Sequence, residues 1–157
     1  MTMNVHAYQD PHVILEALGR KRIAVVGLSS NELRASNFVG YYLKRHGYDV
    51  IPVNPREDEI MGLKSYPSLL DVPGQIDVVD VFRDPSAVPD IATEAVARGA
   101  EFLWLQFGVI SEEGVRIAEA GGMKCIVDRC IKIEHARYMG RMHWLGFNTE
   151  SVSARRR

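Results

Sequence analysis

The stretch Ile23-Ala24-Val25-Val26-Gly27-Leu28-Ser29-Ser30 carries the signal that decides the fold. Its apolar, β-branched residues run without interruption to Gly27, a pattern typical of a strand buried on both faces. A polar stretch continues to Ala35, and Ser36 is the expected N-cap of a following helix, because its hydroxyl can accept a bond from a free backbone N–H group. The segment therefore predicts a strand, a loop and a helix in that order.

The alternation of strand and helix continues along the chain. The predicted strands are residues 23–27, 49–53, 76–82, 102–107 and 125–127, and the predicted helices are residues 13–18, 36–46, 85–98 and 112–120. Residues 56–74 contain several glycines and prolines and are expected to form short turns packed on the sheet. Helices between successive strands are the crossovers that a parallel sheet requires. We predict an α/β fold, Rossmann-like and doubly wound, with a mainly parallel five-stranded sheet and helices on both faces.

Apolar side chains at helical spacing indicate which residues face the core. The helix over residues 36–46 is expected to turn Phe38, Val39, Tyr42 and Leu43 toward one side. In the irregular segment the expected anchors are Ile60, Leu63, Tyr66, Leu69 and Leu70.

Length and composition restrict the class of protein. The 157 residues suit one domain over residues 1–157, with residues 1–11 as an N-terminal extension and residues 151–157 as a flexible tail. Lys+Arg number 19 and Asp+Glu 20, so the basic excess of a nucleic-acid-binding surface is lacking. No apolar run reaches the roughly 20 residues of a membrane span. The two cysteines are too few for a disulfide framework and no signal peptide is evident, so we expect a cytoplasmic protein.

The carboxyl ends of the predicted strands are the expected binding site, because ligands of such folds lie in the crevice beyond them. The strand tips are Gly27 to Ser30, Val53 to Arg56, Phe82 to Asp84, Gln106 to Gly108, and Asp128 to Cys130. Each tip holds a glycine, a proline, an amide or a charge. This clustering indicates one binding crevice.

The first tip suits an anion. It leads into a helix N-terminus, where free N–H groups and the helix dipole favour phosphate, and Ser29, Ser30 and Ser36 add hydroxyl groups. An ordinary NAD site is disfavoured, because Ser29 replaces the second glycine of G-x-G-x-x-G and Arg56 follows the second strand where an acid would bind ribose. The alternative is that Ser36 only caps the helix and that Arg34 and Arg56 are surface charges.

Catalytic and metal-binding patterns are scarce. The histidines at positions 6, 12, 46, 135 and 143 are scattered, and none pairs with cysteine or carboxylate at the spacing of a metal site. His46 is expected to interact with the dipole at its helix C-terminus. Cys130 lies at a strand tip beside Arg129, a setting that lowers the pKa of a thiol, although a structural role is the alternative. We therefore expect neither a metal site nor a catalytic set.

Several segments in one order carry a resemblance to a known family. They are Val25–Ser29, Arg34–Ser36, Gly47–Pro55, Gly62–Leu69, Asp77–Arg83, Trp104–Gly108 and Asp128–Cys130. With them the chain resembles the small single-domain coenzyme A-binding proteins that are related to the N-terminal domain of the succinyl-CoA synthetase α subunit. The resemblance spans most of the chain and implies a Rossmann-like fold whose crevice holds the nucleotide end of coenzyme A (CoA).

The resemblance also implies a role for each tip. The pyrophosphate or 3′-phosphate would meet Gly27, Ser29, Ser30, Arg34 and Ser36; the adenosine would be flanked by Asn54, Pro55 and Arg56; and the remaining crevice would be lined by Phe82, Arg83, Gln106 and Gly108. Glu32 departs from the family, which often has proline there. A carboxylate repels phosphate, so the Glu32 side chain either points outward or lowers the affinity.

Three functions remain open at this point. The first is a CoA or acyl-CoA binding protein without catalytic activity of its own. The resemblance implies this because the related synthetases carry their reactive phosphohistidine in a following ligase domain and not in the CoA-binding domain. The second is a CoA-holding subunit of an acyl-CoA synthetase or transferase complex, with a ligase-type protein partner; a homodimer is the other expected assembly. The third is an NAD(H)-binding module similar to redox sensors. A mixed disulfide between Cys130 and the CoA thiol is a further hypothesis.

Overall fold

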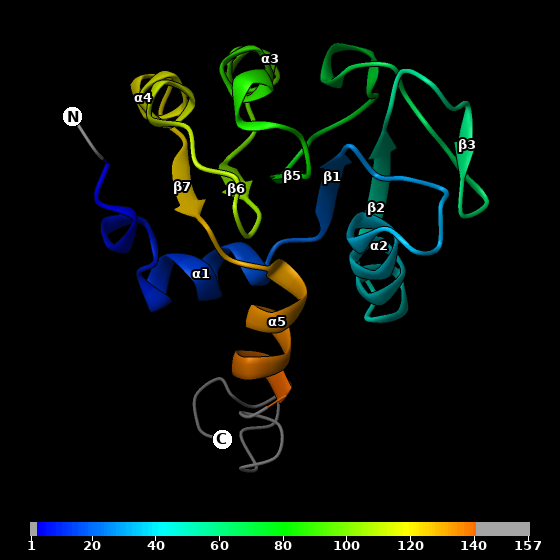
Figure 1. Ribbon diagram of the computed structural model, residues 1–157, viewed down its shortest axis with the longest axis horizontal. Helices are drawn as coiled ribbons and strands as arrows, with labels where there is room; N and C mark the ends of the chain where they lie inside the picture. The colour runs from blue at the N-terminus through cyan, green and yellow to red at the C-terminus, as the bar shows by residue number, and fades with distance from the viewer. Residues whose placement is uncertain (1–2, 141–157) are drawn as a thin grey trace.

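A computed structural model describes residues 3–140 and contains one central parallel sheet (Figure 1). Its five strands lie in the order β2-β1-β5-β6-β7. They are β1 (Arg22–Val26), β2 (Asp49–Val53), β5 (Val78–Val81), β6 (Phe102–Leu105) and β7 (Lys124–Val127). All four strand pairs are parallel, so the predicted five-stranded doubly wound sheet is confirmed.

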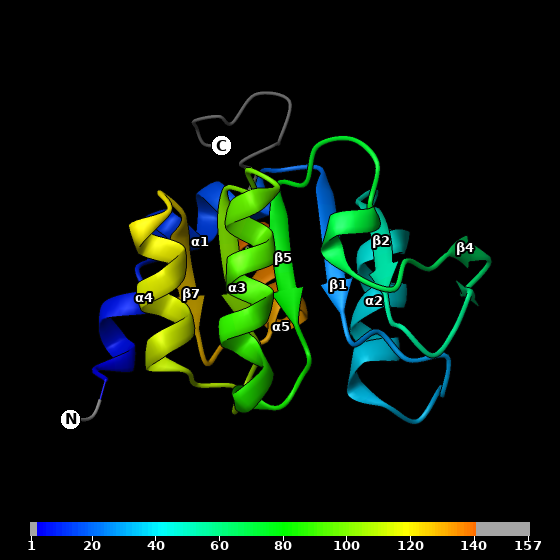
Figure 2. The ribbon, with the colours of Figure 1, turned by 90° about the horizontal axis from the view of Figure 1, so that it is seen from above.

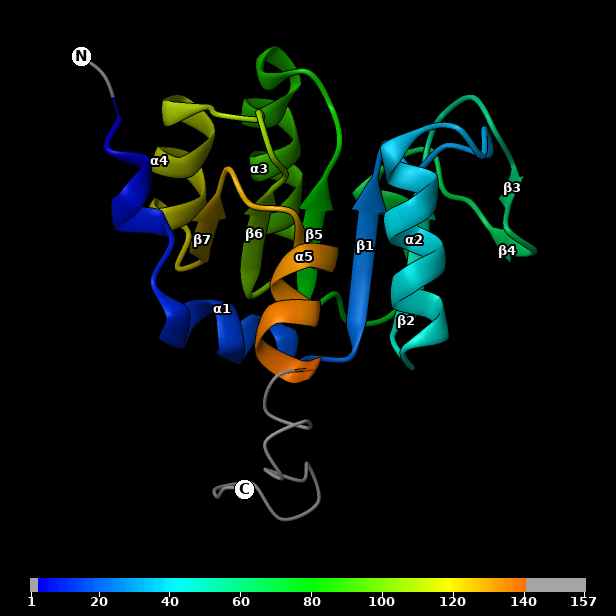
Figure 3. The same ribbon diagram turned by 60° about the horizontal axis from the view of Figure 1, so that its bottom comes forward.

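Helices cover both faces of the sheet and make a three-layer sandwich (Figure 2). They are α1 (Pro11–Leu18), α2 (Ala35–Arg45), α3 (Val88–Ala97), α4 (Glu112–Ala120) and α5 (Ile131–His135). Helices α3 and α4 pack on one face, where Ala24 and Val26 of β1 point. Helices α1, α2 and α5 pack on the other face, over Ile23 and Val25 (Figure 3). No helix within residues 3–140 is long and apolar enough to cross a bilayer.

Two predicted core positions are wrong. Phe38 is 58% exposed, because Val39 and Leu43, four residues apart, form the buried stripe of α2 and Phe38 lies about 100° away from Val39 around the helix. Leu70 is exposed because it follows the buried Leu69 in the 3-10 turn Leu69–Asp71, where adjacent side chains diverge. The helix predicted over 85–98 begins as a separate 3-10 turn, Pro85–Ala87, and the N-terminal segment holds another, Val5–Tyr8.

The predicted irregular segment contains a short hairpin that sequence reasoning did not identify. Strands β3 (Glu59–Ile60) and β4 (Leu63–Lys64) pair antiparallel around Met61 and Gly62, whose φ angles of 59° and 75° suit a tight turn. The hairpin is fastened to the sheet, since the Tyr66 N–H donates to the Pro52 carbonyl at 3.0 Å. The chain between β2 and β5 thus returns to the edge of β2.

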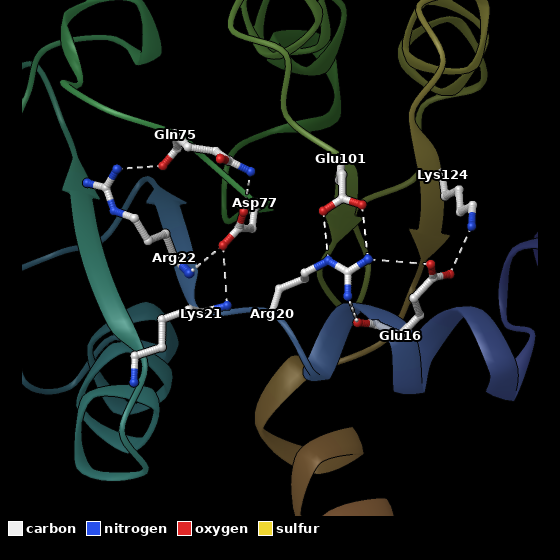
Figure 4. A network of polar contacts seen from close by, with 8 residues as sticks. All are labelled: Glu16, Arg20, Lys21, Arg22, Gln75, Asp77, Glu101 and Lys124. Carbon is white, nitrogen blue, oxygen red and sulfur yellow. Dashed lines mark hydrogen bonds and ion pairs between the residues drawn. The ribbon is translucent and has the colours of Figure 1, made fainter.

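The amino ends of the strands are joined by a polar network (Figure 4). The Arg20 guanidinium donates to both carboxylate oxygens of Glu101, at 2.7 and 3.0 Å, and these bonds hold the pKa of Glu101 below its usual range. Asp77 accepts from the backbone N–H groups of Lys21 and Arg22. These contacts hold α1, β1 and β6 together at the edge opposite the strand tips.

The tips of β1 and β5 approach each other closely at Gly27. Its φ angle is +91°, and a Cβ placed on it would lie 2.7 Å from the carbonyl oxygen of Phe82. The Phe82 N–H donates to the Val26 carbonyl at 2.8 Å, so neither chain can move aside without losing this bond. Position 27 therefore requires glycine for its backbone conformation and for the space available.

Substitution of Gly27 tests this close approach. Gly47 is a matched control, because its φ is also +91° but no atom lies within 4 Å of a Cβ placed there. We expect Gly47→Ala to lower the free energy of unfolding by about 1–2 kcal/mol for the backbone conformation alone. Gly27→Ala should cost at least about 1 kcal/mol more from the steric clash. Chemical denaturation measures both, and equal losses would contradict the account.

Candidate functional site

The candidate site is the edge of the sheet where the five parallel strands end (Figure 3). From β1 the chain passes to β2 on one side and then to β5 on the other, so the strand order reverses between β1 and β5. Such a reversal opens a crevice beyond the strand ends, where ligands of doubly wound folds bind. Gly27 and Phe82 lie at this point.

The serine loop, residues 27–34, is held against the first turn of α2. The Ser29 N–H donates to Ser36 Oγ at 3.0 Å, and Asn37 Nδ2 donates to the Ser29 carbonyl at 2.8 Å. The predicted N-cap is wrong: Arg34 occupies that position, and Ser36 lies within the helix. The Ser36 hydroxyl instead accepts from the loop, which folds the loop back in front of the helix N-terminus.

The tip of β2 supports the same loop. Asn54 Nδ2 donates to the Leu28 carbonyl at 3.0 Å, and Asn54 Oδ1 accepts from the Arg56 N–H at 2.8 Å. The Ser30 N–H donates to Glu57 Oε2 at 3.3 Å. A carboxylate oxygen therefore already takes one loop N–H group. Sequence reasoning missed Glu57, because a charged residue in a loop carries no local signal of this distant contact.

Three arginines stand around the loop with no ion-pair partner among residues 3–140: Arg34, Arg56 and Arg83. All three are exposed. The Arg83 side chain lies over the junction of β1 and β5, since its Cδ is 3.1 Å from a Cβ placed on Gly27. Pro55 and Arg83 also line a cavity of about 180 Å³ beside the tips of β1 and β2. The structure thus brings the predicted arginines to one edge.

Gln106 turns inward, away from the crevice that it was expected to line. Only 3% of it is exposed, and its Nε2 donates to Asp80 Oδ1. Asp80 is fully buried in the middle of the sheet, and its Oδ2 has no hydrogen-bond partner in the described part of the chain. Burial raises the pKa of Asp80 to about 8, so this carboxyl is mostly protonated at neutral pH. A ligand contact for Gln106 remains a prediction.

Beside Gln106, the tip of β6 exposes apolar side chains. Phe107 is 74% exposed and Ile110 is 42% exposed. The Gly108 N–H donates to Asp128 Oδ1 at 2.7 Å, which ties this loop to the tip of β7. The apolar run over residues 102–107 predicts Phe107 at the end of a buried strand, but β6 ends at Leu105 and Phe107 lies in the exposed loop that follows.

Cys130 lies at the tip of β7, as predicted, and is the N-cap residue of α5. Its neighbour Arg129 is 3.9 Å from the buried carboxylate of Glu134, which also pairs with Arg137 at 3.3 Å. The Arg129 charge is thus shared with a carboxylate rather than left to the thiol. Cys125 is buried, which raises the pKa of its thiol to about 12. Within residues 3–140 no group of His, Cys, Asp and Glu is arranged to hold a metal.

Two histidines that are far apart in sequence meet where α5 packs on α2. Tyr42 and His135 Nδ1 are hydrogen-bonded at 2.7 Å, and the His46 ring stacks on Tyr42 with centroids 4.0 Å apart. Burial lowers the pKa of His135 to about 4. His46 Nδ1 bonds to the Tyr42 carbonyl at 2.8 Å, near the helix C-terminus. This cluster joins α2 to α5, near the end of α2 that lies away from the serine loop.

The buried carboxyl predicts a pH dependence of stability. The pKa of Asp80 is higher in the folded than in the unfolded chain, so the folded chain holds this proton more tightly. The free energy of unfolding therefore falls as the pH rises from about 4 to about 8. The loss is roughly 1.4 kcal/mol per pH unit in that range. Asp80→Asn should remove this loss and be more stable than the wild type at pH 8.

Urea denaturation of the two proteins from pH 5 to pH 9 measures the difference. Subtraction of one profile from the other cancels the titration of all other groups. Parallel profiles would contradict a neutral, buried Asp80.

Comparison with known proteins shows the family to which the chain belongs. The model of the CoA binding domain matches residues 21–136. Protein YneT of Bacillus subtilis is 43% identical over 124 residues, covering 78% of this chain and 92% of that protein. The α subunit of acetate–CoA ligase (ADP-forming) II of Pyrococcus furiosus is 32% identical over 122 residues, and the chain spans 27% of its length.

Solved structures agree with the sequence match. A hypothetical protein from Pyrococcus horikoshii OT3 superposes with a TM-score of 0.83 at 36% identity, covering 89% of this chain and 99% of that one. The resemblance to small CoA-binding proteins and to synthetase α subunits is thereby confirmed. The chain belongs to the CoA binding domain family.

Proposed function

We propose that this chain binds CoA or acyl-CoA at the carboxyl edge of its sheet, with the phosphate groups over the serine loop. The observation that carries the proposal is the convergence of the serine loop, the α2 N-terminus and Arg83 at the junction of β1 and β5. The helix dipole and the N–H groups of the first turn of α2 stabilise phosphate there. Membership in the CoA binding domain family supports this choice of ligand.

The charge of the exposed arginines also supports CoA as the ligand. The pyrophosphate and the 3′-phosphate of CoA are anionic, and Arg34, Arg56 and Arg83 offer guanidinium groups with no carboxylate partner in the described chain. Planar guanidinium groups bind phosphate through paired hydrogen bonds. A ligand phosphate at the Ser30 N–H would replace the Glu57 carboxylate, which takes that bond in the structure. Glu57 therefore has to move aside when the ligand binds.

The far end of the crevice suits the remainder of the ligand. Phe107 and Ile110 expose apolar surface beside the tips of β6 and β7. The methyl and methylene groups of the pantetheine arm and of an acyl chain are apolar, and their contact with these side chains removes apolar area of both partners from water. The proposed pose therefore runs from the serine loop toward Phe107.

We assign the chain the role of a binding module, with no reaction of its own. The match to YneT supports this role, because the matched region makes up 92% of that protein. The second candidate is a CoA-holding subunit that acts with a separate ligase chain. The 32% identity to a ligase α subunit favours it, because the match covers one part of a larger protein.

Calorimetric titration of ligand-stripped protein tests the binding role. CoA should bind saturably, and Arg34→Gln, Arg56→Gln or Arg83→Gln should weaken binding by about 1.5–3 kcal/mol each where the guanidinium contacts phosphate. Arg116→Gln is the control, because it removes an exposed guanidinium on α4, away from the tips. Unchanged affinity in all three variants would overturn the proposed phosphate site.

Two further ligands separate the competing functions. Dephospho-CoA lacks the 3′-phosphate and should bind more weakly than CoA if an arginine contacts that group. NAD should not compete with CoA. Binding of NAD in preference to CoA would favour the third function, an NAD(H)-binding module.

Co-purification from the native cell separates the module from the subunit. The proposed module emerges without a stoichiometric ligase-type chain. A larger nucleotide-binding chain that elutes with it at equal stoichiometry would instead establish the second candidate function.

A further inference from the structure

The outer side of α2 exposes an apolar surface beside the proposed ligand site. Leu33 is 87% exposed, Phe38 58% and Tyr41 54%. They line a groove of about 680 Å³, which Met61 from the turn of the β3–β4 hairpin also lines. We call this surface the α2 groove. Large apolar side chains that are exposed together in one groove favour an interaction site.

The α2 groove carries opposite charges at its two ends. Glu32, which belongs to the serine loop, lies at one end, and Lys44 lies at the other end, where its Nζ donates to the Met61 carbonyl at 3.1 Å. The sequence left open whether the Glu32 side chain points outward or lowers the affinity for phosphate. Its place in the lining of the α2 groove favours the outward orientation. A surface with an acid at one end and a base at the other is complementary to its own copy turned by 180°.

The positions of the groove residues agree with such a two-fold arrangement. Along α2, Phe38 lies midway between Ala35 and Tyr41, whereas Glu32 precedes the helix in the serine loop and Lys44 lies in its last turn. With two α2 helices antiparallel and the axis beside Phe38, each acid faces the base of the other copy and each Tyr41 ring faces a small, exposed alanine. The net charge of −1 gives little repulsion between copies.

We propose that the α2 groove is the interface of a homodimer in which two α2 helices pack antiparallel about a two-fold axis at Phe38. Glu32 of each chain pairs with Lys44 of the partner subunit. Apolar contact of Phe38, Tyr41 and Leu33 supplies the association energy, and the two ion pairs fix the register. The outer side of each serine loop, at Ser30 and Glu32, lies along this interface.

Sedimentation equilibrium of the full chain over a wide concentration range tests the proposal. The wild type should form a reversible dimer, and Phe38→Glu should shift it to monomer. Leu70→Glu is the matched control, because Leu70 is similarly exposed at 56% but lies outside the groove, and it should leave the dimer intact. A wild-type monomer at all concentrations, or a dimer unaffected by Phe38→Glu, would overturn the proposal.

A charge-swap mixture tests the register without removing an apolar side chain. Glu32→Lys alone and Lys44→Glu alone each place like charges at both ends of the interface, so each variant should dimerise roughly tenfold more weakly than the wild type. Mixing the two variants restores both ion pairs and should give a heterodimer of near wild-type affinity. Failure of the mixture to associate better than either variant would overturn the antiparallel pairing. Circular dichroism melting checks that each variant is folded.

Discussion

The close approach of β1 and β5 at Gly27 determines how the rest of the binding edge is arranged. A Cβ at this position would lie 2.7 Å from the Phe82 carbonyl oxygen, and the positive φ of Gly27 turns the chain out of the sheet at the same point. The serine loop therefore leaves β1 directly over the reversal of strand order. Its bonds to Ser36 and Asn37 then bring it in front of the α2 N-terminus. The proposed phosphate site depends on this turn.

The two edges of the sheet differ in how their charged side chains are used. At the amino edge, hydrogen bonds join the ends of α1, β1 and β6, and they involve Arg20, Glu101 and Asp77 (Figure 4). The loops of the candidate site lie at the opposite edge. At the carboxyl edge, Arg34, Arg56 and Arg83 are exposed without ion-pair partners in the described chain, which is an arrangement suited to an anionic ligand. Glu57 is the internal carboxylate that a ligand phosphate would replace. A family of CoA binding domains and this charge distribution point to the same kind of ligand.

Local pattern was sufficient for the order of the elements. Continuous apolar runs such as Ile23 to Val26 identified the buried strands, and parallel pairing then fixed which tips share an edge. Contacts between distant segments were not predictable in this way. Gln106 follows an apolar strand and reads as exposed, yet it turns inward because Asp80 on the neighbouring strand offers an acceptor. Its apolar side chain and helical spacing predict that Phe38 is buried, and only the packing of α2 on the sheet shows that it faces outward. The predicted tail, residues 151–157, lies outside the described residues.

Hydrogen–deuterium exchange of the full chain with and without CoA is the most direct test of a CoA site at the carboxyl edge. The account predicts slower exchange of backbone N–H groups in the serine loop, in the first turn of α2 and around Arg56 and Arg83. The amino edge around Asp77 should exchange at the same rate with and without the ligand. Protection confined to the amino edge, or to the surface of α4, would contradict the proposed site.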